Sequence, residues 1–557
     1  MVDKLNLRSS LVTLTFMLFI LFASAMGKII YVDDDVVAAN NGLSWAEAYC
    51  CLQNALGEAQ SGDEIRVAQG IYKPDRELVT GRDIRVVASG DRTAAFQLKN
   101  GVTLRGGYAG LGGSEPNARD ISLYETILSG DLDGDDNDVY DPCDLLTEPT
   151  RAENSYSVVT GSVEDCLLDG FTVSGGNANG PMQTSPGGIA DPSEYGWGGG
   201  IHLIPSSVTI TNCTFRNNSA SGGGGGIFSA LGNGPILDNC IFTWNSGGSV
   251  VIEDSAYYGF GGGGGIYNED NYPTITNCTF IENYAPIEGG GMYNGRNNPI
   301  LTNCTFVENS AYTGGGMYNS SSNATLTICI FTANTATNQG GGMESTRSNL
   351  TLTNCTFSGN SAYNDYDYLS SFGGGINSLE GDTIILTNCT FAHNSAQYGN
   401  ALCSSNFEPS NFEFINCILW DGGQEIFYSD FHPITITITY SNIQGGWSGE
   451  GGNNIDADPM FAYPGYWVDV NDPNAVVEPN DPNAVWIDGD YHLKSQAGRW
   501  DPNSLSWIVD DVTSPCIDTG DPNSPIGNEP FPNGDIINMG AYGGTEKASK
   551  SYIDGAS

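Results

Sequence analysis

The stretch LTNCTFVENSAYTGGGMYN, residues 301–319, decides the fold of this 557-residue chain. It is one copy of a repeated unit, and apolar and polar residues alternate within it. Similar stretches recur along the chain, each with a cysteine at the same place: Cys213, Cys240, Cys278, Cys304, Cys329, Cys355, Cys389 and Cys417. The shortest spacing between successive cysteines is 25 residues, and the longer spacings hold insertions. A repeat of this length indicates a solenoid, in which each turn buries its apolar side chains only against neighbouring turns.

Apolar and polar residues alternate around each cysteine, and the alternation changes phase at the asparagine before it. In NLTLTNCTF, residues 349–357, Leu350 and Leu352 share one phase, whereas Cys355 and Phe357 share the other. One face stays inward across such a change only if the backbone bends there, and asparagine tolerates the left-handed conformation that a bend needs. A second asparagine, three residues after each phenylalanine, predicts a second column of corners: Asn218, Asn245, Asn283, Asn309, Asn334, Asn360 and Asn394.

A glycine run and a short third strand complete each unit, as in GGGMYN at residues 289–294 and 314–319. Three strands per turn predict three parallel sheets that stack at about 4.8 Å per turn. Parallel crossovers are almost always right-handed. We therefore expect an all-β fold, a right-handed parallel β-helix, over residues 158–445.

The N-terminus predicts export. Lys4 and Arg8 precede an apolar run over residues 11–23, and residues 23–25 are small enough for a cleavage site. Residues 1–25 are therefore expected to be a signal peptide cleaved after Ala25, because the run is short for a membrane span, and the alternative is an uncleaved anchor. No later stretch has the character of a transmembrane helix. The exported chain should be secreted, or lie at the cell surface in association with the outer membrane.

The regions that flank the repeats are expected to cap them, because a solenoid exposes its core at both ends. Residues 26–157 should hold an N-terminal cap and the first coils, with an amphipathic helix at 44–62. Ser44 and Glu47 have the spacing of a capping box at the start of that helix. Residues 446–557 lack the repeat and should form a loop-rich C-terminal cap or tail.

The charge balance excludes one class of partner. The chain has 20 basic and 65 acidic side chains, a formal net charge of −45, and no lysine between Lys99 and Lys494. A nucleic-acid partner is not expected, because neutralising phosphates needs a basic face.

The repeat unit also resembles a known family. Its Phe-x-x-Asn motifs and glycine-flanked strands resemble the repeats of chlamydial polymorphic outer-membrane proteins. The motifs are FRNN (215–218), FIEN (280–283), FVEN (306–309), FTAN (331–334), FSGN (357–360) and FAHN (391–394). More broadly, the chain is similar to right-handed β-helices of the pectin-lyase-like superfamily. The first resemblance implies adhesion at the cell surface, and the second includes many polysaccharide lyases and hydrolases.

These features predict an exported, non-catalytic β-helix that acts as an adhesin or glycan-binding protein. One residue of each glycine-flanked strand should point outward, and four of these residues are aromatic: Phe228, Tyr267, Tyr293 and Tyr318. They are expected to form an exposed column that stacks on sugar rings of a polysaccharide or on another surface partner. The competing interpretation is that the rings only pair with one another or lie under loops.

The alternative function is a polysaccharide lyase or glycoside hydrolase. A uronate lyase needs a cation and a base near the substrate, yet residues 200–420 hold only Arg216, Arg296 and Arg347 as permanent cations. No catalytic residue is predicted. Paired carboxylates that meet across coils would favour a hydrolase.

An acidic loop is the candidate for a metal site. DLDGDDNDVYD, residues 131–141, contains the carboxylates Asp131, Asp133, Asp135, Asp136 and Asp138. Oxygen-rich loops bind hard cations, so calcium is the cofactor that the sequence predicts here. The loop does not fit an EF-hand, and the competing interpretation is a solvated acidic loop.

The repeated cysteines are expected to be buried thiols of the core. Disulfides between coils and a metal site stay open as alternatives, although single cysteines at each repeat do not favour metal. Cys50 with Cys51, and Cys143 with Cys166, are the better candidates for bridges.

Overall fold

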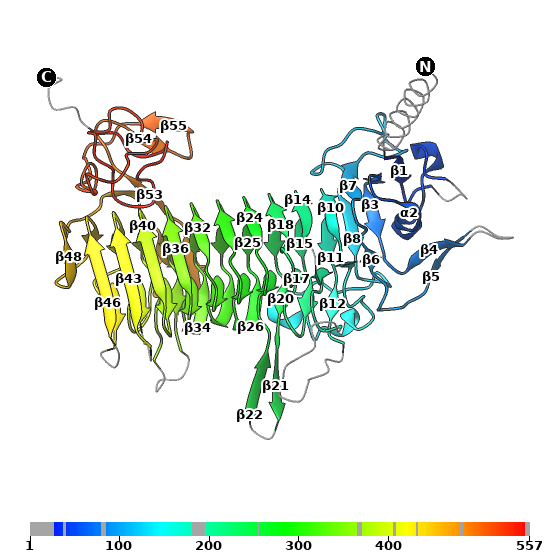
Figure 1. Ribbon diagram of the computed structural model, residues 1–557, viewed down its shortest axis with the longest axis horizontal. Helices are drawn as coiled ribbons and strands as arrows, with labels where there is room; N and C mark the ends of the chain where they lie inside the picture. Colours follow the sequence, from blue (N-terminus) through cyan, green and yellow to red (C-terminus); the bar gives the residue numbers. More distant parts are fainter. Residues whose placement is uncertain are drawn as a thin grey trace, which may run out of the picture.

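The computed structural model describes residues 27–551, apart from 37–40, 80–84, 181–194, 206, 254–255, 365–369, 405–407, 430–432, 480 and 482. The signal peptide predicted over residues 1–25 lies outside the described residues. The chain winds around one axis, and its turns stack into a rod (Figure 1). The predicted right-handed parallel β-helix is confirmed.

Within the described residues, the turns form four parallel sheets, named here by their strand counts. The 14-stranded sheet contains β1 (Ile29–Val32), β2 (Glu64–Ala68), β7 (Thr103–Tyr108), β10 (Glu164–Asp169), β14 (Ser207–Thr211), β18 (Ile236–Asp238), β24 (Thr274–Thr276), β28 (Ile300–Thr302), β32 (Thr325–Thr327), β36 (Asn349–Thr353), β40 (Thr383–Thr387), β43 (Ser410–Ile415), β46 (Ile434–Thr439) and β48 (Glu450–Gly452). The 12-stranded sheet contains β3 (Gly70–Tyr72), β8 (Thr126–Ser129), β11 (Thr172–Ser174), β15 (Thr214–Arg216), β19 (Ile241–Thr243), β25 (Thr279–Ile281), β29 (Thr305–Val307), β33 (Ile330–Thr332), β37 (Thr356–Ser358), β41 (Thr390–Ala392), β44 (Ile418–Trp420) and β47 (Asn442–Ile443).

The other two sheets complete each turn. The 7-stranded sheet contains β12 (Asn177–Ala178), β16 (Ser219–Ala220), β20 (Ser246–Gly247), β26 (Tyr284–Glu288), β30 (Ser310–Thr313), β34 (Thr335–Gln339) and β38 (Ser361–Ala362). The 11-stranded sheet contains β6 (Phe96–Gln97), β9 (Val159–Gly161), β13 (Ile201–Leu203), β17 (Ile227–Ala230), β23 (Ile266–Glu269), β27 (Met292–Gly295), β31 (Met317–Ser320), β35 (Met343–Thr346), β39 (Ile376–Ser378), β42 (Leu402–Ser404) and β45 (Ile426–Tyr428).

Each full turn therefore has one strand more than the sequence predicted. Residues after the second corner, such as β30 in the opening stretch, are extended and pair with the next coil before the glycine run begins. The run then turns at Gly314, whose φ of +65° favours glycine. The prediction of three sheets is wrong because this glycine turn is a corner between two strands.

The first corner of each coil lies where the sequence predicted it. Asn212, Asn239, Asn277, Asn303, Asn354, Asn388 and Asn416 have φ values of 52–55°. Some of these asparagine side chains also form hydrogen bonds with one another between neighbouring coils. Asn303 Nδ2, for example, donates to Asn277 Oδ1 at 2.8 Å. In the coil of β32 the same corner is held by Ile328, with φ 55°.

Replacing Ile328 with asparagine is expected to stabilise the protein by about 1 kcal/mol, because a β-branched residue is strained at positive φ. Ile328 is 46% exposed, so little burial is lost. Urea denaturation measures the change. The control is Ile300→Asn, since Ile300 is 51% exposed but lies within β28. Equal gains at both positions would mean that replacing an exposed apolar side chain with a polar one is the cause, and not relief of backbone strain.

The second corner lies one residue earlier than predicted. Positive φ values fall on Asn217, Trp244, Glu282, Glu308, Ala333, Gly359 and His393. The asparagines that follow are buried and form a ladder through the core. Asn309 Nδ2, for example, donates to Asn334 Oδ1 and to the Phe280 carbonyl, both at 2.9 Å. The ladder asparagines turn inward because they satisfy backbone groups that the corner leaves unpaired.

Phenylalanine rings and cysteines fill the core. Successive rings from Phe215 to Phe391 are parallel, with centroids 4.5–4.8 Å apart. The repeated cysteines are buried and free, as predicted, and burial raises the pKa of Cys213 to about 12. Cys143 is exposed whereas Cys166 is buried in β10, so the bridge considered between them is not formed.

The N-terminal cap holds a shorter helix than predicted, α2 (Leu52–Glu58), after a 3-10 turn, η1 (Trp45–Glu47). Tyr49 pairs with Val32 in the continuation of the sheet, which interrupts the predicted helix. Ser44 makes no side-chain capping bond, so the predicted capping box is wrong. Two more 3-10 turns, η2 (Pro142–Asp144) and η3 (Pro149–Arg151), lie in the acidic region.

The remaining strands pair antiparallel in small sheets. One hairpin is β4 (Arg76–Val79) with β5 (Arg85–Ala88), and another is β21 (Ser249–Glu253) with β22 (Ala256–Phe260). The tail contains β49 (Phe461–Tyr463), β50 (Tyr466–Asp469), β51 (Asp472–Val476), β52 (Ala484–Ile487), β53 (Asp490–Leu493), β54 (Arg499–Asp501) and β55 (Ser506–Ile508).

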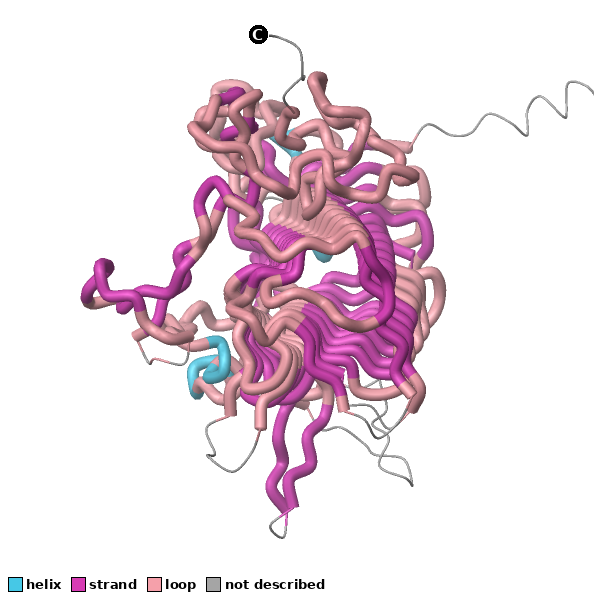
Figure 2. The backbone as a smooth tube through the Cα atoms, turned by 90° about the vertical axis from the view of Figure 1, so that its left-hand side faces the viewer, coloured by secondary structure: helices cyan, strands magenta, loops and turns pink. Residues whose placement is uncertain are grey.

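The tail packs on the flank of the last coils, as Figures 1 and 2 show. Asn388 Nδ2 donates to the Asn538 carbonyl, and the Ala541 N–H donates to Thr390 Oγ1, both at 2.9 Å. Trp447 packs against the core at its C-terminal end. The region predicted as a cap thus closes the core through Trp447, while most of it covers a side of the rod. In the described part of the chain, no helix has the length and apolar character needed to cross a bilayer.

Candidate functional site

The predicted aromatic residues form a column on the 11-stranded sheet. Phe228, Tyr267, Tyr293 and Tyr318 are register partners on neighbouring strands. Their ring centroids are 5.5, 4.3 and 5.6 Å apart, with interplanar angles of 24°, 9° and 8°. The rings therefore cover one another's faces, and the partly buried tyrosines offer mainly their edges. This geometry favours the interpretation that the rings pair with one another.

Phe228 is a correction to the predicted exposed column, because its side chain is only 1% exposed. The ring of Trp197 lies over it at a centroid distance of 4.8 Å, and His202 stacks on it at 5.4 Å. Trp197 comes just before the glycine run of another coil, so the alternation within one strand gave no sign of this cover.

Carboxyl groups surround the edges of the tyrosines. The Tyr267 hydroxyl donates to Glu269 Oε2 at 3.0 Å, and Glu288 forms a hydrogen bond with Tyr318. Burial raises the pKa of Glu288 to about 7 and holds the pKa of the fully buried Glu344 well above its usual range. The hydroxyls of Tyr267 and Tyr318 thus already bond to neighbouring acids, which leaves fewer groups for a ligand.

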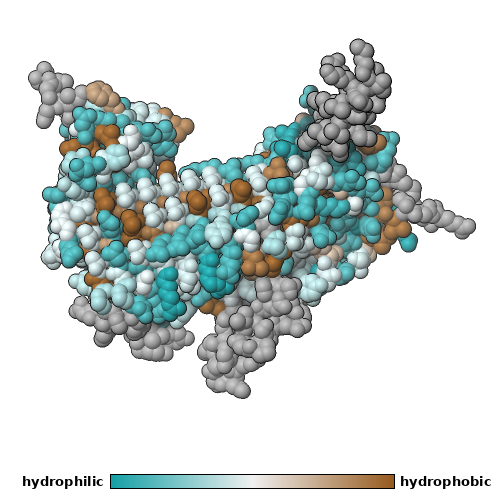
Figure 3. Space-filling view, viewed as in Figure 1, coloured by the Kyte–Doolittle hydropathy of each residue, from teal (hydrophilic) through white to brown (hydrophobic). Residues whose placement is uncertain are grey.

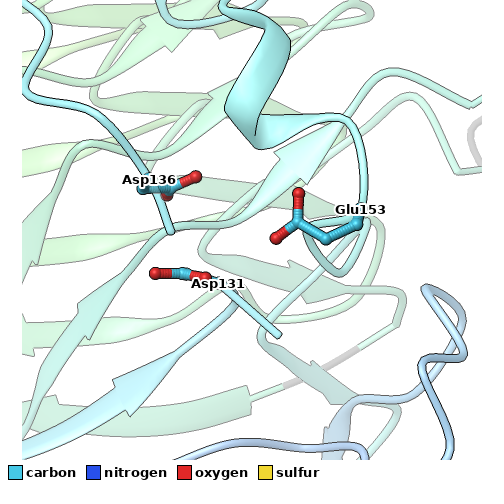
Figure 4. A group of neighbouring side chains, drawn as sticks. All are labelled: Asp131, Asp136 and Glu153. Atoms are coloured by element: carbon cyan, nitrogen blue, oxygen red, sulfur yellow. The ribbon is translucent and has the colours of Figure 1, made fainter. Parts of the chain in front are cut away.

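The acidic loop brings part of the predicted metal site together. Carboxylate oxygens of Asp131, Asp136 and Glu153 lie within 4.8 Å of one another, and the three side chains face each other in Figure 4. Asp133 and Asp135 are exposed outside this cluster, and Asp138 only lines the adjoining pocket of about 350 Å³. The prediction of five aspartate ligands is therefore wrong in part. Glu153 was missed because it lies beyond the acidic run.

The chemistry of the cluster suits a hard cation. Asp136 Oδ1 and Glu153 Oε1 are buried and have no hydrogen-bond partner. Arg151 pairs with Asp136 at 3.2 Å, so the cluster keeps an excess of negative charge. Burial raises the pKa of Asp136 and of Glu153, and a bound cation would favour their charged forms.

Calcium is therefore expected to bind this cluster and to stabilise the protein, by about 2.7 kcal/mol at a concentration 100 times the Kd. Glu153→Gln should abolish the stabilisation because it removes one of the three carboxylates. Titration calorimetry and thermal unfolding with calcium or EDTA measure both effects. Asp133→Asn is the matched control, since Asp133 lies on the same loop outside the cluster. Equal losses in both variants would contradict the site.

A saddle lies between the raised ends of the rod and is seen in profile in Figure 3. One raised end contacts β15 through Arg216 and Glu125, and the other contacts β33 through Thr332 and Asp488, so the 12-stranded sheet runs between them. Its N-terminal wall is the loop before β8, held by ion pairs such as Arg119 to Asp169 at 2.9 Å. Its C-terminal wall is the tail, where Asp488 accepts a bond from Thr332 at 3.2 Å. Between the walls, β19, β25 and β29 form the floor, and Ile241 is 41% exposed there.

The second-corner column borders this floor. Trp244, Glu282 and Glu308 follow β19, β25 and β29 on successive coils. The Trp244 N–H donates to the carbonyl of Ile281, and the same bond joins Glu282 to the coil of Glu308. Because coils lie about 4.8 Å apart, a tryptophan and two glutamates occupy equivalent positions of one row. Partial burial and the neighbouring Glu282 raise the pKa of Glu308.

Comparison with protein families agrees with the fold. Residues 195–337 and 314–458 match the family described as right handed beta helix region, and residues 465–520 match the family described as disaggregatase related. A search of curated proteins finds no match. Neither family match tests the resemblance to chlamydial polymorphic outer-membrane proteins, which stays a prediction.

Solved structures with a similar path of the chain include three proteins whose names refer to carbohydrates. Pectate lyase Pel9A is 13% identical with a TM-score of 0.39, covering 93% of this chain and 97% of that one. XylC in complex with xylose is 11% identical with a TM-score of 0.39, covering 78% and 87%. Lacto-N-biosidase from Eubacterium ramulus is 12% identical with a TM-score of 0.32, covering 74% and 68%. Such values are too low to assign any of these activities to this chain.

Proposed function

Starting from a right-handed parallel β-helix of the pectin-lyase-like superfamily, we propose that this protein is exported and binds a polysaccharide in the saddle. The observation that carries the proposal is the row of Trp244, Glu282 and Glu308, which directly follow the floor strands β19, β25 and β29 on successive coils. An indole offers a flat apolar surface for a sugar ring, and the carboxylates accept hydrogen bonds from its hydroxyls. At a cell surface such binding would make the protein an adhesin.

The charges near the saddle favour a neutral glycan over a polyuronate. An anionic polymer needs unpaired cations, and the arginines of the N-terminal wall are already held by acids. Arg105 pairs with Asp169 at 3.0 Å, and Arg216 pairs with Glu125 at 3.3 Å. The floor itself is bordered by carboxylates, which would repel a uronate.

Trp244→Ala is expected to weaken binding to a neutral glycan by about tenfold, the effect of losing about 1.4 kcal/mol of stacking. A glycan array, followed by titration of the best neutral oligosaccharide, measures the loss. The control is the double variant Tyr293→Ala and Tyr318→Ala, which should leave this binding unchanged. If only the double variant loses binding, the tyrosine column is the site. If the unaltered protein binds no glycan, the proposed function is wrong.

Glycoside hydrolysis is the second candidate function, and the adjacent Glu282 and Glu308 favour it. Hydrolases use two carboxylic groups, one as an acid and one as a base or nucleophile. The raised pKa of Glu308 suits the acid, and Glu282 is the partner. Release of reducing ends from a bound glycan tests the activity. Glu308→Gln should lower the rate about 100-fold or more while binding persists, whereas binding without any cleavage would exclude this candidate.

A further inference from the structure

Two adjacent cysteines of the N-terminal cap line a pocket that contains none of the saddle residues named above. Cys50 Sγ and Cys51 Sγ are 3.2 Å apart, and both side chains are about 95% buried. The pocket has a volume of about 230 Å³ and is also lined by Asp34, Lys73 and Arg76. Two thiols in contact at the wall of a cavity can react with the same small molecule.

We propose that Cys50 and Cys51 are a redox-active vicinal dithiol that closes to a disulfide by exchange with a low-molecular-weight disulfide. The Cys50 thiolate attacks one sulfur of the donor, whose S–S bond breaks and releases one thiol. Cys51 then attacks the Cys50 sulfur of the mixed disulfide, and the second donor thiol leaves. The two cysteine protons end on the two released thiols, so the donor is reduced and the dithiol is oxidised.

The surroundings of Cys50 and Cys51 give the two thiols different roles in the exchange. The hydrogen bond from Cys51 lowers the pKa of Cys50, which makes Cys50 the better nucleophile. Among the charged residues that line the pocket, Arg76 favours the thiolate of Cys51, whereas Asp34 opposes ionisation of Cys50, so the hydrogen bond between the thiols is what distinguishes Cys50. In the core, by contrast, burial raises the pKa of Cys213 to about 12.

The local fold leaves both sulfurs available for this chemistry. Cys51 is the N-cap of α2, but its side chain makes no capping hydrogen bond. Leu78 of β4 packs against the two cysteines as their apolar neighbour. Closing the ring therefore removes no hydrogen bond from the start of the helix, and the apolar wall suits a disulfide as well as two thiols.

Oxidation of the folded protein with glutathione disulfide tests the proposal. The full exported chain carries Cys143→Ser, because Cys143 is exposed and would react by itself. The expected result is a mass loss of about 2 Da, from the two hydrogens removed by ring closure. Peptide mapping should place it at residues 50–51, and dithiothreitol should reverse it. A folded protein that keeps its mass, or loses it at other cysteines, would overturn the proposal.

Two variants and one chemical probe distinguish ring closure between Cys50 and Cys51 from other reactions of thiols. Cys51→Ala should stop at a mixed disulfide on Cys50, whereas Cys213→Ala in the buried column should still close the ring. Phenylarsine oxide, which needs two thiols within reach, should bind the reduced protein once and protect it from glutathione disulfide. Failure of the arsenical to bind the native protein would show that the two sulfurs do not act together.

Discussion

Asn309→Ala is expected to lower the free energy of unfolding by about 3–5 kcal/mol, because several buried polar groups lose their partners. Asn309 is fully buried and donates to Phe280 and Asn334 at 2.9 Å. It also accepts from Asn283 Nδ2 at 2.9 Å. Alanine fills none of these roles, and the ladder is buried at this coil. Urea denaturation followed by circular dichroism measures the loss.

The control for this prediction is Asn303→Gly, at the exposed first corner of the same coil. Glycine keeps the left-handed conformation at Asn303, and the surface bond to Asn277 is exchanged for water. A change below about 1 kcal/mol is expected. Similar losses in the two variants would mean that the buried ladder contributes no more than the surface one.

Stability is expected to fall as the pH rises from about 4 to 7 and to level off by pH 8, in contrast to proteins whose carboxylates are paired. Burial raises the pKa of Asp382 to about 6 and of Glu529 to about 7. In the unfolded chain these groups titrate near 4, so the folded state binds more protons between about pH 4 and 7. Their stabilisation is complete below that window and is lost as the pH passes through the folded values.

The size of this loss should be on the order of 3–6 kcal/mol for the two groups together. Urea denaturation at pH 5, 6, 7 and 8 in about 0.3 M salt measures it, with the salt screening the general repulsion of an acidic chain. Glu529→Gln should flatten part of the slope, because its Oε1 can still accept from Asn538 and Gly544. The exposed Glu478→Gln is the control. Stability that rises toward pH 8 would contradict the prediction.

The repeat could be predicted from sequence because each of its signals is local. The phase change at Asn303 and the glycine at Gly314 both lie within one coil. The second corner could not be placed, since its positive φ falls on residues such as Trp244 and Glu308, which have no left-handed preference. The ladder imposes that conformation from neighbouring coils, and a single unit does not reveal it.

The candidate sites depend on contacts that the sequence pattern does not contain. Glu153 meets Asp131 only because the chain turns back through η3, and Trp197 covers Phe228 from another coil. The saddle exists because the tail folds back on coils that precede it by more than 100 residues, as in the bond between Asn388 and Asn538. The alternation of apolar and polar residues predicts which side chains lie inside the rod. The acidic cluster, the cover on Phe228 and the saddle are formed outside the core, by contacts between distant segments.

The identical stacking of coils makes the length of this molecule a property that can change without redesign. Met292, Met317 and Met343 occupy equivalent places in three successive coils, each paired in register with the next. Removing or duplicating residues 292–316, one whole coil, would join the same kinds of residues to each other and leave the ladder unbroken. The distance between the two walls would change by about 4.8 Å, one strand spacing. Duplication or loss of coils within the gene would thus change the distance between the two walls in fixed steps.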